Sequence, residues 1–214
     1  MRRDGFTLIE MLVVIGILAI LMGASIAGYA RVTRSAERAK AQELVSNVAT
    51  ALAVIYQKDG VWPPKLLNGA QGGCGRLDAD VARALVSRDV IGLSNNGKKG
   101  ADMKLTGLDK CGVVTPWATT ALKRAGREAS TSTRVGDGGS TVQDHIFYYA
   151  LDLDGDGVVR SANVGGVNID VRAQAIVWCC GRDGKLAAYR KGGGKTKGGG
   201  NIYSWQVGQT EDVQ

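Results

Sequence analysis

The run Gly5-Phe6-Thr7-Leu8-Ile9-Glu10 opens an apolar stretch that continues to Ala30. At about 1.5 Å per residue, a helix of this length reaches roughly 37 Å, which is enough to cross a bilayer. The clearly polar side chains in the stretch are Thr7, Glu10, Ser25 and the hydroxyl of Tyr29. An ionisable group inside a membrane is costly and usually has a functional partner. The sequence therefore predicts a membrane-spanning helix over residues 6–30, with Glu10 in a functional role.

The same six residues resemble the class III signal of type IV pilins and type II secretion pseudopilins. The resemblance implies that a prepilin peptidase cuts after Gly5 and that Phe6 becomes the methylated amino terminus. It also implies that Glu10 neutralises the Phe6 ammonium of the adjacent subunit during assembly. A carboxylate suits that place, because a helix start already carries about half a positive charge. The alternative is an ordinary anchor or a secretory signal peptide with a basic start at Met1-Arg2-Arg3.

The basic residues Arg2 and Arg3 favour a cytoplasmic amino terminus. This predicts a single-pass protein of the inner membrane, with a periplasmic carboxy-terminal domain and a place in a fibre after assembly. Small residues at helix-packing spacing would let spanning helices approach closely. They are Gly23, Ala24, Ala27 and Gly28.

Past Ala30 the helical pattern continues, with apolar residues on one face and charged residues mostly between them. The apolar positions are Val32, Ala36, Leu44, Val48, Leu52 and Ile55. We expect one helix from Phe6 to Tyr56, which Asp59-Gly60 and Pro63-Pro64 end. The segment from Tyr56 to Pro64 is similar to the helix exit of pseudopilins.

We divide the chain into a leader (1–5), a membrane and assembly half-helix (6–30), an amphipathic half-helix with its exit turn (31–64), a variable region (65–143) and a sheet region (144–214).

Short helices are expected over Asp78–Val90 and Thr115–Arg124, and an exposed connection over Gly126–Ser140. Strands are expected over His145–Leu151, Asn168–Trp178 and Ile202–Val207, because these runs are rich in β-branched and aromatic residues. The predicted class is α+β: a pilin fold with a long amino-terminal helix packed on a small antiparallel sheet.

Alternate carboxylates occur at Asp152, Asp154 and Asp156, followed by Gly157 at the sixth position of the loop. This spacing matches the start of a calcium loop, so we predict these three side chains and the Val158 carbonyl as calcium ligands. The twelfth position is Asn163 rather than a bidentate glutamate, which excludes a full EF-hand. The alternative is a solvated turn between strands.

Four cysteines in an exported chain indicate disulfides, because the compartment is oxidising. Cys179 and Cys180 are adjacent in a predicted strand, where neighbouring side chains point to opposite faces. We therefore expect each to bond a separate partner, Cys74 or Cys111. A bridge between Cys179 and Cys180 is the alternative.

No catalytic constellation is visible, so the sequence does not predict an enzyme. His145 is the only histidine, which leaves no zinc site or hydrolytic triad, and we expect it to be an ordinary strand residue. Gly194-Lys195-Thr196 resembles the end of a phosphate loop, but Tyr189 stands where the first glycine of that pattern is needed. The net charge of +7 permits anionic partners without selecting one. The glycine-rich segment from Lys185 to Lys197 could touch DNA or anionic glycan, or be a solvated loop.

The segment from Trp178 to Trp205 is similar to the closing segment of major pseudopilins, with Asn201 where that family usually has aspartate. Together the resemblances imply a structural subunit of a type II secretion-like or type IV pilus-like fibre. It would assemble through its amino-terminal helix with copies of itself and related subunits, on an inner-membrane platform, in support of protein export. The alternative is a minor type IV pilin that acts in priming, adhesion or DNA uptake through the basic loop.

Overall fold

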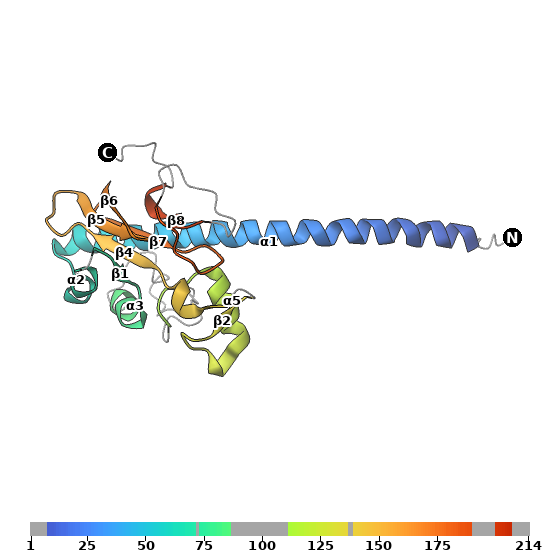
Figure 1. The fold of residues 1–214 in the computed structure, drawn as a ribbon, viewed down its shortest axis with the longest axis horizontal. Coiled ribbons are helices and arrows are strands. Elements are labelled where there is room, and N and C mark those ends of the chain that lie inside the picture. Colours follow the sequence, from blue (N-terminus) through green and yellow to red (C-terminus); the bar gives the residue numbers. More distant parts are fainter. Residues whose placement is uncertain (1–7, 72, 87–110, 137–138, 190–199, 207–214) are drawn as a thin grey trace. The chain divides into compact units, whose positions relative to one another are not determined.

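The computed structural model describes residues 8–71, 73–86, 111–136, 139–189 and 200–206. The chain divides into two compact units, Met1–Ala39 and Lys40–Gln214, which we call unit 1 and unit 2. Figure 1 shows the elements in chain order, and the two units are described separately below.

Helix α1 (Leu8–Asp59) supplies the described part of unit 1 and the first element of unit 2. It contains no proline and consists mainly of good helix formers such as Ala, Leu, Ile, Met, Glu and Lys. The helix ends where the sequence predicts, because Gly60 takes a φ of 68° and its N–H donates to the Tyr56 carbonyl at 2.8 Å. Pro63-Pro64 does more than stop a helix. Pro64 is the first residue of the next helix, a position where its missing N–H costs nothing.

Unit 2 contains short helices and strands that follow α1. The helices are α2 (Pro64–Ala70), α3 (Ala79–Val86), α5 (Pro116–Ala125) and the 3-10 turns η1 (Gly126–Glu128), η2 (Val142–His145) and η3 (Ser204–Gln206). The strands are β1 (Gly75–Arg76), β2 (Arg134–Val135), β3 (Ser140–Thr141), β4 (Tyr148–Leu151), β5 (Val158–Val164), β6 (Val167–Arg172), β7 (Ala175–Cys179) and β8 (Ile202–Tyr203). The main sheet has the order β1-β4-β7-β8, with every described neighbour antiparallel, and β2–β3 and β5–β6 form separate pairs. The α+β class and the antiparallel sheet are confirmed.

The main sheet separates two apolar clusters, because alternate residues of a strand point to opposite faces. Tyr149 in β4 and Val177 in β7 belong to the cluster that includes the part of α1 in unit 2. Ile176 and Trp178 belong to the second cluster, which the β5–β6 hairpin completes. The buried positions of α1 are Ala41, Val45, Val48, Ala51, Leu52 and Ile55. Of the predicted apolar stripe, the part from Val48 onward is buried and Leu44 is half-buried, whereas Ala36 and Val32 are exposed.

One predicted helix and one predicted strand differ from the observed elements. The helix predicted over Asp78–Val90 is α3, which begins after Asp78 because that carboxylate accepts the N–H of Val81 at 3.0 Å, and residues 87–90 lie outside the described part. The strand predicted from Asn168 to Trp178 is two strands, since the chain turns at Ala173–Gln174 to pass from the hairpin to the main sheet.

The ends of the sheet region also differ. The stretch predicted as a strand from His145 begins as η2, whose first turn is closed by a capping box between Thr141 and Asp144. The last strand is only Ile202–Tyr203, followed by η3, and Val207 lies outside the described residues. The connection predicted over Gly126–Ser140 contains η1 and β2. The sequence did not predict α2 or β5.

Candidate assembly site

Unit 1 presents an apolar helix surface that its own unit does not cover. Glu10 lies in the first turn of α1, with an exposed side chain. Its large apolar neighbours along the helix are also exposed, and Leu8 is 83% accessible. The exposed set is Leu8, Ile9, Met11, Leu12, Val13, Val14, Ile15, Ile17, Leu18, Ile20, Leu21, Met22 and Tyr29. So much accessible apolar surface indicates a partner surface or an apolar medium.

Gly5 and Phe6, the predicted processing residues, lie outside the described part of the chain. Within that part, no helix combines the length and the apolar character of a membrane span.

The aspartate loop joins β4 to β5, and Asp152 shapes it. Asp152 is 1% exposed, and its two carboxylate oxygens accept the N–H groups of Gly155 at 2.8 Å and Gly157 at 2.7 Å. Both glycines have positive φ, 77° and 82°, which only a residue without Cβ adopts easily. Asp152 thus caps the loop backbone. As predicted, strands rather than helices flank this loop.

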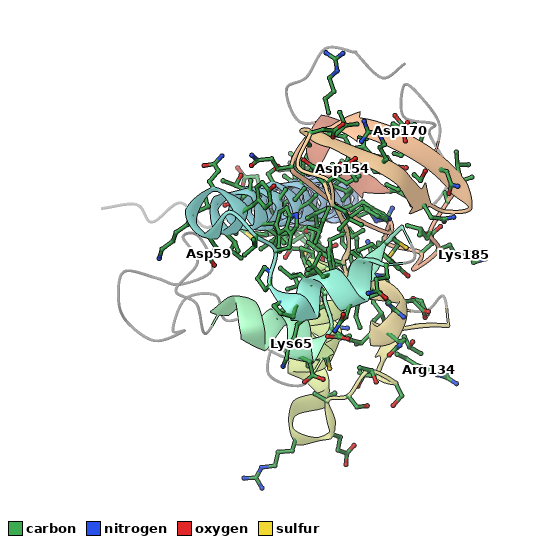
Figure 2. All side chains as sticks on the ribbon, turned by 90° about the vertical axis from the view of Figure 1, so that its left-hand side faces the viewer. Asp59, Lys65, Arg134, Asp154, Asp170 and Lys185 are labelled. Carbon is green, nitrogen blue, oxygen red and sulfur yellow. The ribbon has the colours of Figure 1, made fainter. Side chains whose placement is uncertain are left out.

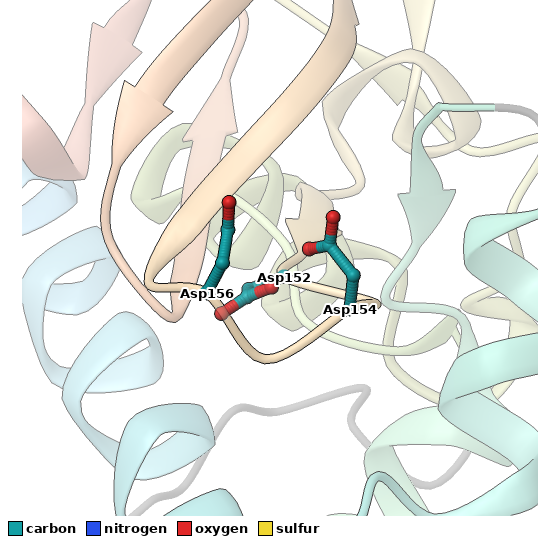
Figure 3. A group of neighbouring side chains, drawn as sticks. All are labelled: Asp152, Asp154 and Asp156. Atoms are coloured by element: carbon teal, nitrogen blue, oxygen red, sulfur yellow. The ribbon is translucent and has the colours of Figure 1, made fainter.

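The structure brings the three predicted carboxylates together, with one oxygen of each within 4.8 Å of the others. Figure 3 shows Asp154 and Asp156 rising from the loop on either side of Asp152. The sequence did not predict Arg160, whose guanidinium donates to Asp154 Oδ2 at 2.5 Å and also to Asp156. Desolvation would raise the pKa of Asp156, but the hydrogen bonds from Arg160 and the Val158 N–H lower it. Sharing a hydrogen bond with Asp152 raises the pKa of Asp154.

The donor set fits a hard cation only in part. Three carboxylates at this spacing suit calcium. However, both oxygens of Asp152 already accept backbone N–H groups, and Arg160 supplies a positive charge to Asp154 and Asp156. A cation would have to replace that guanidinium. The roles of these side chains and of the Val158 carbonyl as calcium ligands stay predictions.

The loop is fastened to the exit of α1. The indole N–H of Trp62 donates to the Asp152 carbonyl at 2.5 Å, and the Trp62 ring stacks on Tyr56 with centroids 4.7 Å apart. Gln57 and Gln174 also meet, at 3.5 Å. The Trp62–Asp152 and Gln57–Gln174 bonds join positions 90 and 117 residues apart in sequence, so no local pattern could predict them.

His145 is not an ordinary strand residue, because it ends η2 and its side chain is fully buried. Its Nδ1 accepts the indole N–H of Trp117 at 2.7 Å and lies 3.3 Å from the Cys180 sulfur, while its Nε2 lies 3.2 Å from Ser140 Oγ. An indole can only donate, so the ring proton is on Nε2. Desolvation lowers the pKa of His145 to about 4 and raises the pKa of Cys180 to about 12. Burial thus favours a neutral imidazole and a protonated thiol, which is the less reactive form of a cysteine.

Cys74, Cys179 and Cys180 are thiols in the structure. Cys74 precedes β1, and β4 lies between β1 and β7, the strand that ends with Cys179. Two strand spacings amount to about 10 Å, which exceeds the Cα separation of about 7 Å that a disulfide spans. Cys111 is buried in the same cluster as Cys179. The pairing stays a prediction, and bridges from Cys74 to Cys179 or Cys180 would require a different strand arrangement.

The basic segment predicted as a possible anion contact is described only in part. Lys185 is exposed, and residues 190–199, which include Lys195 and Lys197, lie outside the described residues.

Comparisons with known proteins agree with the geometry of α1. The family model for the prokaryotic N-terminal methylation motif matches residues 1–26. A relative, "Fimbrial protein EcpC" of Eikenella corrodens, is 32% identical over 130 residues, which cover 61% of this chain and 80% of that protein. No solved structure matches. The chain belongs to the family of type IV pilin-like structural subunits.

Proposed function

We propose that this chain is a subunit of a pilin-type fibre that assembles through the first half of α1. The observation that carries the proposal is the uncovered apolar surface of α1 with Glu10 in its first turn. In an apolar surrounding, one carboxylate per subunit is tolerated when a positive charge compensates it. The methylated Phe6 ammonium of a neighbouring copy would supply that charge. A prepilin peptidase would expose Phe6 by cutting after Gly5.

Before assembly, residues 6–30 would hold the subunit in the inner membrane, with unit 2 in the periplasm and an assembly platform as partner. A helix that is apolar all round supports this proposal. We favour a pseudopilin that supports protein export, on the similarity of the helix exit and closing segment. The name of the relative, a fimbrial protein, favours the alternative of a subunit in a surface pilus.

Glu10→Ala tests the fibre proposal in cells that overproduce the full chain. The variant should enter the membrane in normal amounts and fail to join fibres. Fibre yield is measured by shearing and electron microscopy, and contact between subunits by crosslinking. The matched control is Glu43→Ala, because Glu43 is an exposed glutamate of the same helix within unit 2. Normal fibre yield from Glu10→Ala would refute the proposed role. Secretion of exoproteins by a strain that lacks the subunit then separates a pseudopilin from a pilus subunit.

We further propose that the aspartate loop binds calcium weakly. Asp154 and Asp156 would hold the ion, with Asp152 setting the loop conformation. Because the twelfth-position glutamate is missing, we expect a Kd of roughly 0.1–1 mM, as in extracellular modules. The carboxylate cluster supports this proposal, and the place of Arg160 explains why the affinity would be low.

A further inference from the structure

The two ends of the central strands in unit 2 carry opposite charge. β4 runs from Tyr148 to Leu151, and β7 is antiparallel to it, so the aspartate loop follows one end of β4 and meets the start of β7. Asp170 on β6 lies near this end, since Arg172, two residues further on, pairs with Val158 at the loop exit and the Asp170 carboxylate accepts the N–H of Ser161 at 2.8 Å. We call this the acidic end. Its exposed carboxylates are Asp154, Asp156 and Asp170.

The opposite end of β4 carries α5, η1 and β2. The N–H of Thr115 donates to the His145 carbonyl at 3.1 Å, which places the start of α5 just before β4. Figure 1 shows α5 and β2 on the far side of the sheet region from β5 and β6. We call this the basic end. Its exposed cations are Lys123, Arg124, Arg127, Arg134, Arg182 and Lys185.

Among the described residues, each end keeps its sign after internal compensation. At the acidic end, Arg160 and Arg172 offset two of the four carboxylates, which are Asp152, Asp154, Asp156 and Asp170, and Lys58 is balanced by Asp59. At the basic end, Glu128, Asp144 and Asp183 offset half of the exposed cations, and Arg76 is balanced by Asp78. Figure 2 shows Asp154 and Asp170 on one side of unit 2 and Arg134 on another. Leu153, 58% exposed, adds an apolar side chain to the acidic end.

We infer that the acidic end of unit 2, with no calcium on the aspartate loop, docks on the basic end of unit 2 in the next copy of this chain. The inference rests on the proposed fibre, and it names the surfaces through which the head domains meet. A contact between two different surfaces can repeat from copy to copy, and it builds a filament when its rotation does not close into a ring. Complementary charge fixes its direction, because acidic ends repel each other and basic ends repel each other. The occupant of each end is thus a second copy.

Charge exchange tests the contact in the full chain. Arg127→Glu with Arg134→Glu reverses the basic end, and Asp154→Lys with Asp170→Lys reverses the acidic end. Each pair should lower fibre yield at least about tenfold, because like charges then face each other, and the four changes together should restore much of it. The matched control, Arg127→Lys with Arg134→Lys, keeps the charge and should assemble normally.

The rescue separates a lost contact from a misfolded subunit, since four substitutions cannot repair folding that two have damaged. Wild-type yield from either reversed pair overturns the inference, as does a combined variant no better than the pairs. If Glu10→Ala abolishes fibres while both reversed pairs assemble, the proposed function stands and only this contact is refuted. If Glu10→Ala also assembles, the fibre proposal itself fails.

Discussion

The indole N–H of Trp117 donates to Nδ1 of His145 at 2.7 Å, inside unit 2. The bond joins α5 to η2 and requires an imidazole whose Nδ1 carries no proton. Protonation would put a second proton on the ring and remove this acceptor. The folded state therefore depends on a neutral His145.

We expect acid to destabilise unit 2 through His145. Burial depresses the pKa in the folded state from 6.5 to about 4, so stability from this group is complete above pH 6.5 and is lost as pH falls toward 4. The loss amounts to roughly 3 kcal/mol. Urea unfolding at pH 7 and pH 4 measures it on the chain from Arg31 onward. His145→Gln should be less stable at pH 7, and its free energy of unfolding should change less with pH. Equal pH dependence of the two proteins would contradict the role given to His145.

Asn201→Asp should destabilise unit 2 by about 2–3 kcal/mol, since it leaves buried acceptors unpaired. The Asn201 amide is largely buried, and it donates to the Ala187 carbonyl at 2.6 Å and to the Tyr203 hydroxyl at 3.0 Å while accepting the Ala187 N–H at 3.0 Å. A carboxylate has no proton to donate at neutral pH. The control is Asn168→Asp, because Asn168 is exposed and should change stability by less than about 0.5 kcal/mol. Equal stability of the two variants in urea unfolding would disprove this role of the Asn201 amide.

Calcium should stabilise Arg160→Gln more than the parent protein, because the guanidinium no longer competes for Asp154 and Asp156. At about ten times Kd, binding contributes roughly 1.4 kcal/mol and raises the melting temperature by several degrees. Thermal melting in chelator and in millimolar calcium provides the measurement. Arg172→Gln, an exposed arginine of β6, is the control and should respond like the parent. If calcium does not raise the melting temperature of Arg160→Gln, the calcium proposal is wrong and the loop is a solvated turn between strands.

The mature protein should begin at Phe6. The sequence around Gly5 resembles the prepilin site, and the methylation-motif model covers it. Intact mass and amino-terminal sequencing of membrane protein decide this. Gly5→Val should keep the leader. A mature start after Ala27 would mean that a signal peptidase removes the helix, and the fibre proposal would fall.

Local patterns predicted the elements whose causes are local. The long helix and its end at Asp59-Gly60 follow from residue propensity and one glycine of positive φ. The helix start at Pro116 and the turn at Gly157 follow in the same way. The sheet region was predicted less well, because the turn at Ala173–Gln174 depends on which sheet each strand joins. His145 was misassigned because the capping box before it and the buried partners around it produce no hydrophobic periodicity in the sequence.

The sequence by itself determined the class of this protein, because an apolar helix with one early carboxylate and a processing motif are contiguous features. Only the tertiary structure decided how the aspartate loop is anchored and where the charges gather. The bond between Trp62 and Asp152 joins the exit of α1 to the end of β4, and the two residues are 90 positions apart in sequence. The acidic and basic ends likewise arise from residues far apart in sequence that antiparallel pairing of β4 and β7 sorts to opposite sides. Such contacts depend on which strands pair, and pairing is settled by burial over the whole core.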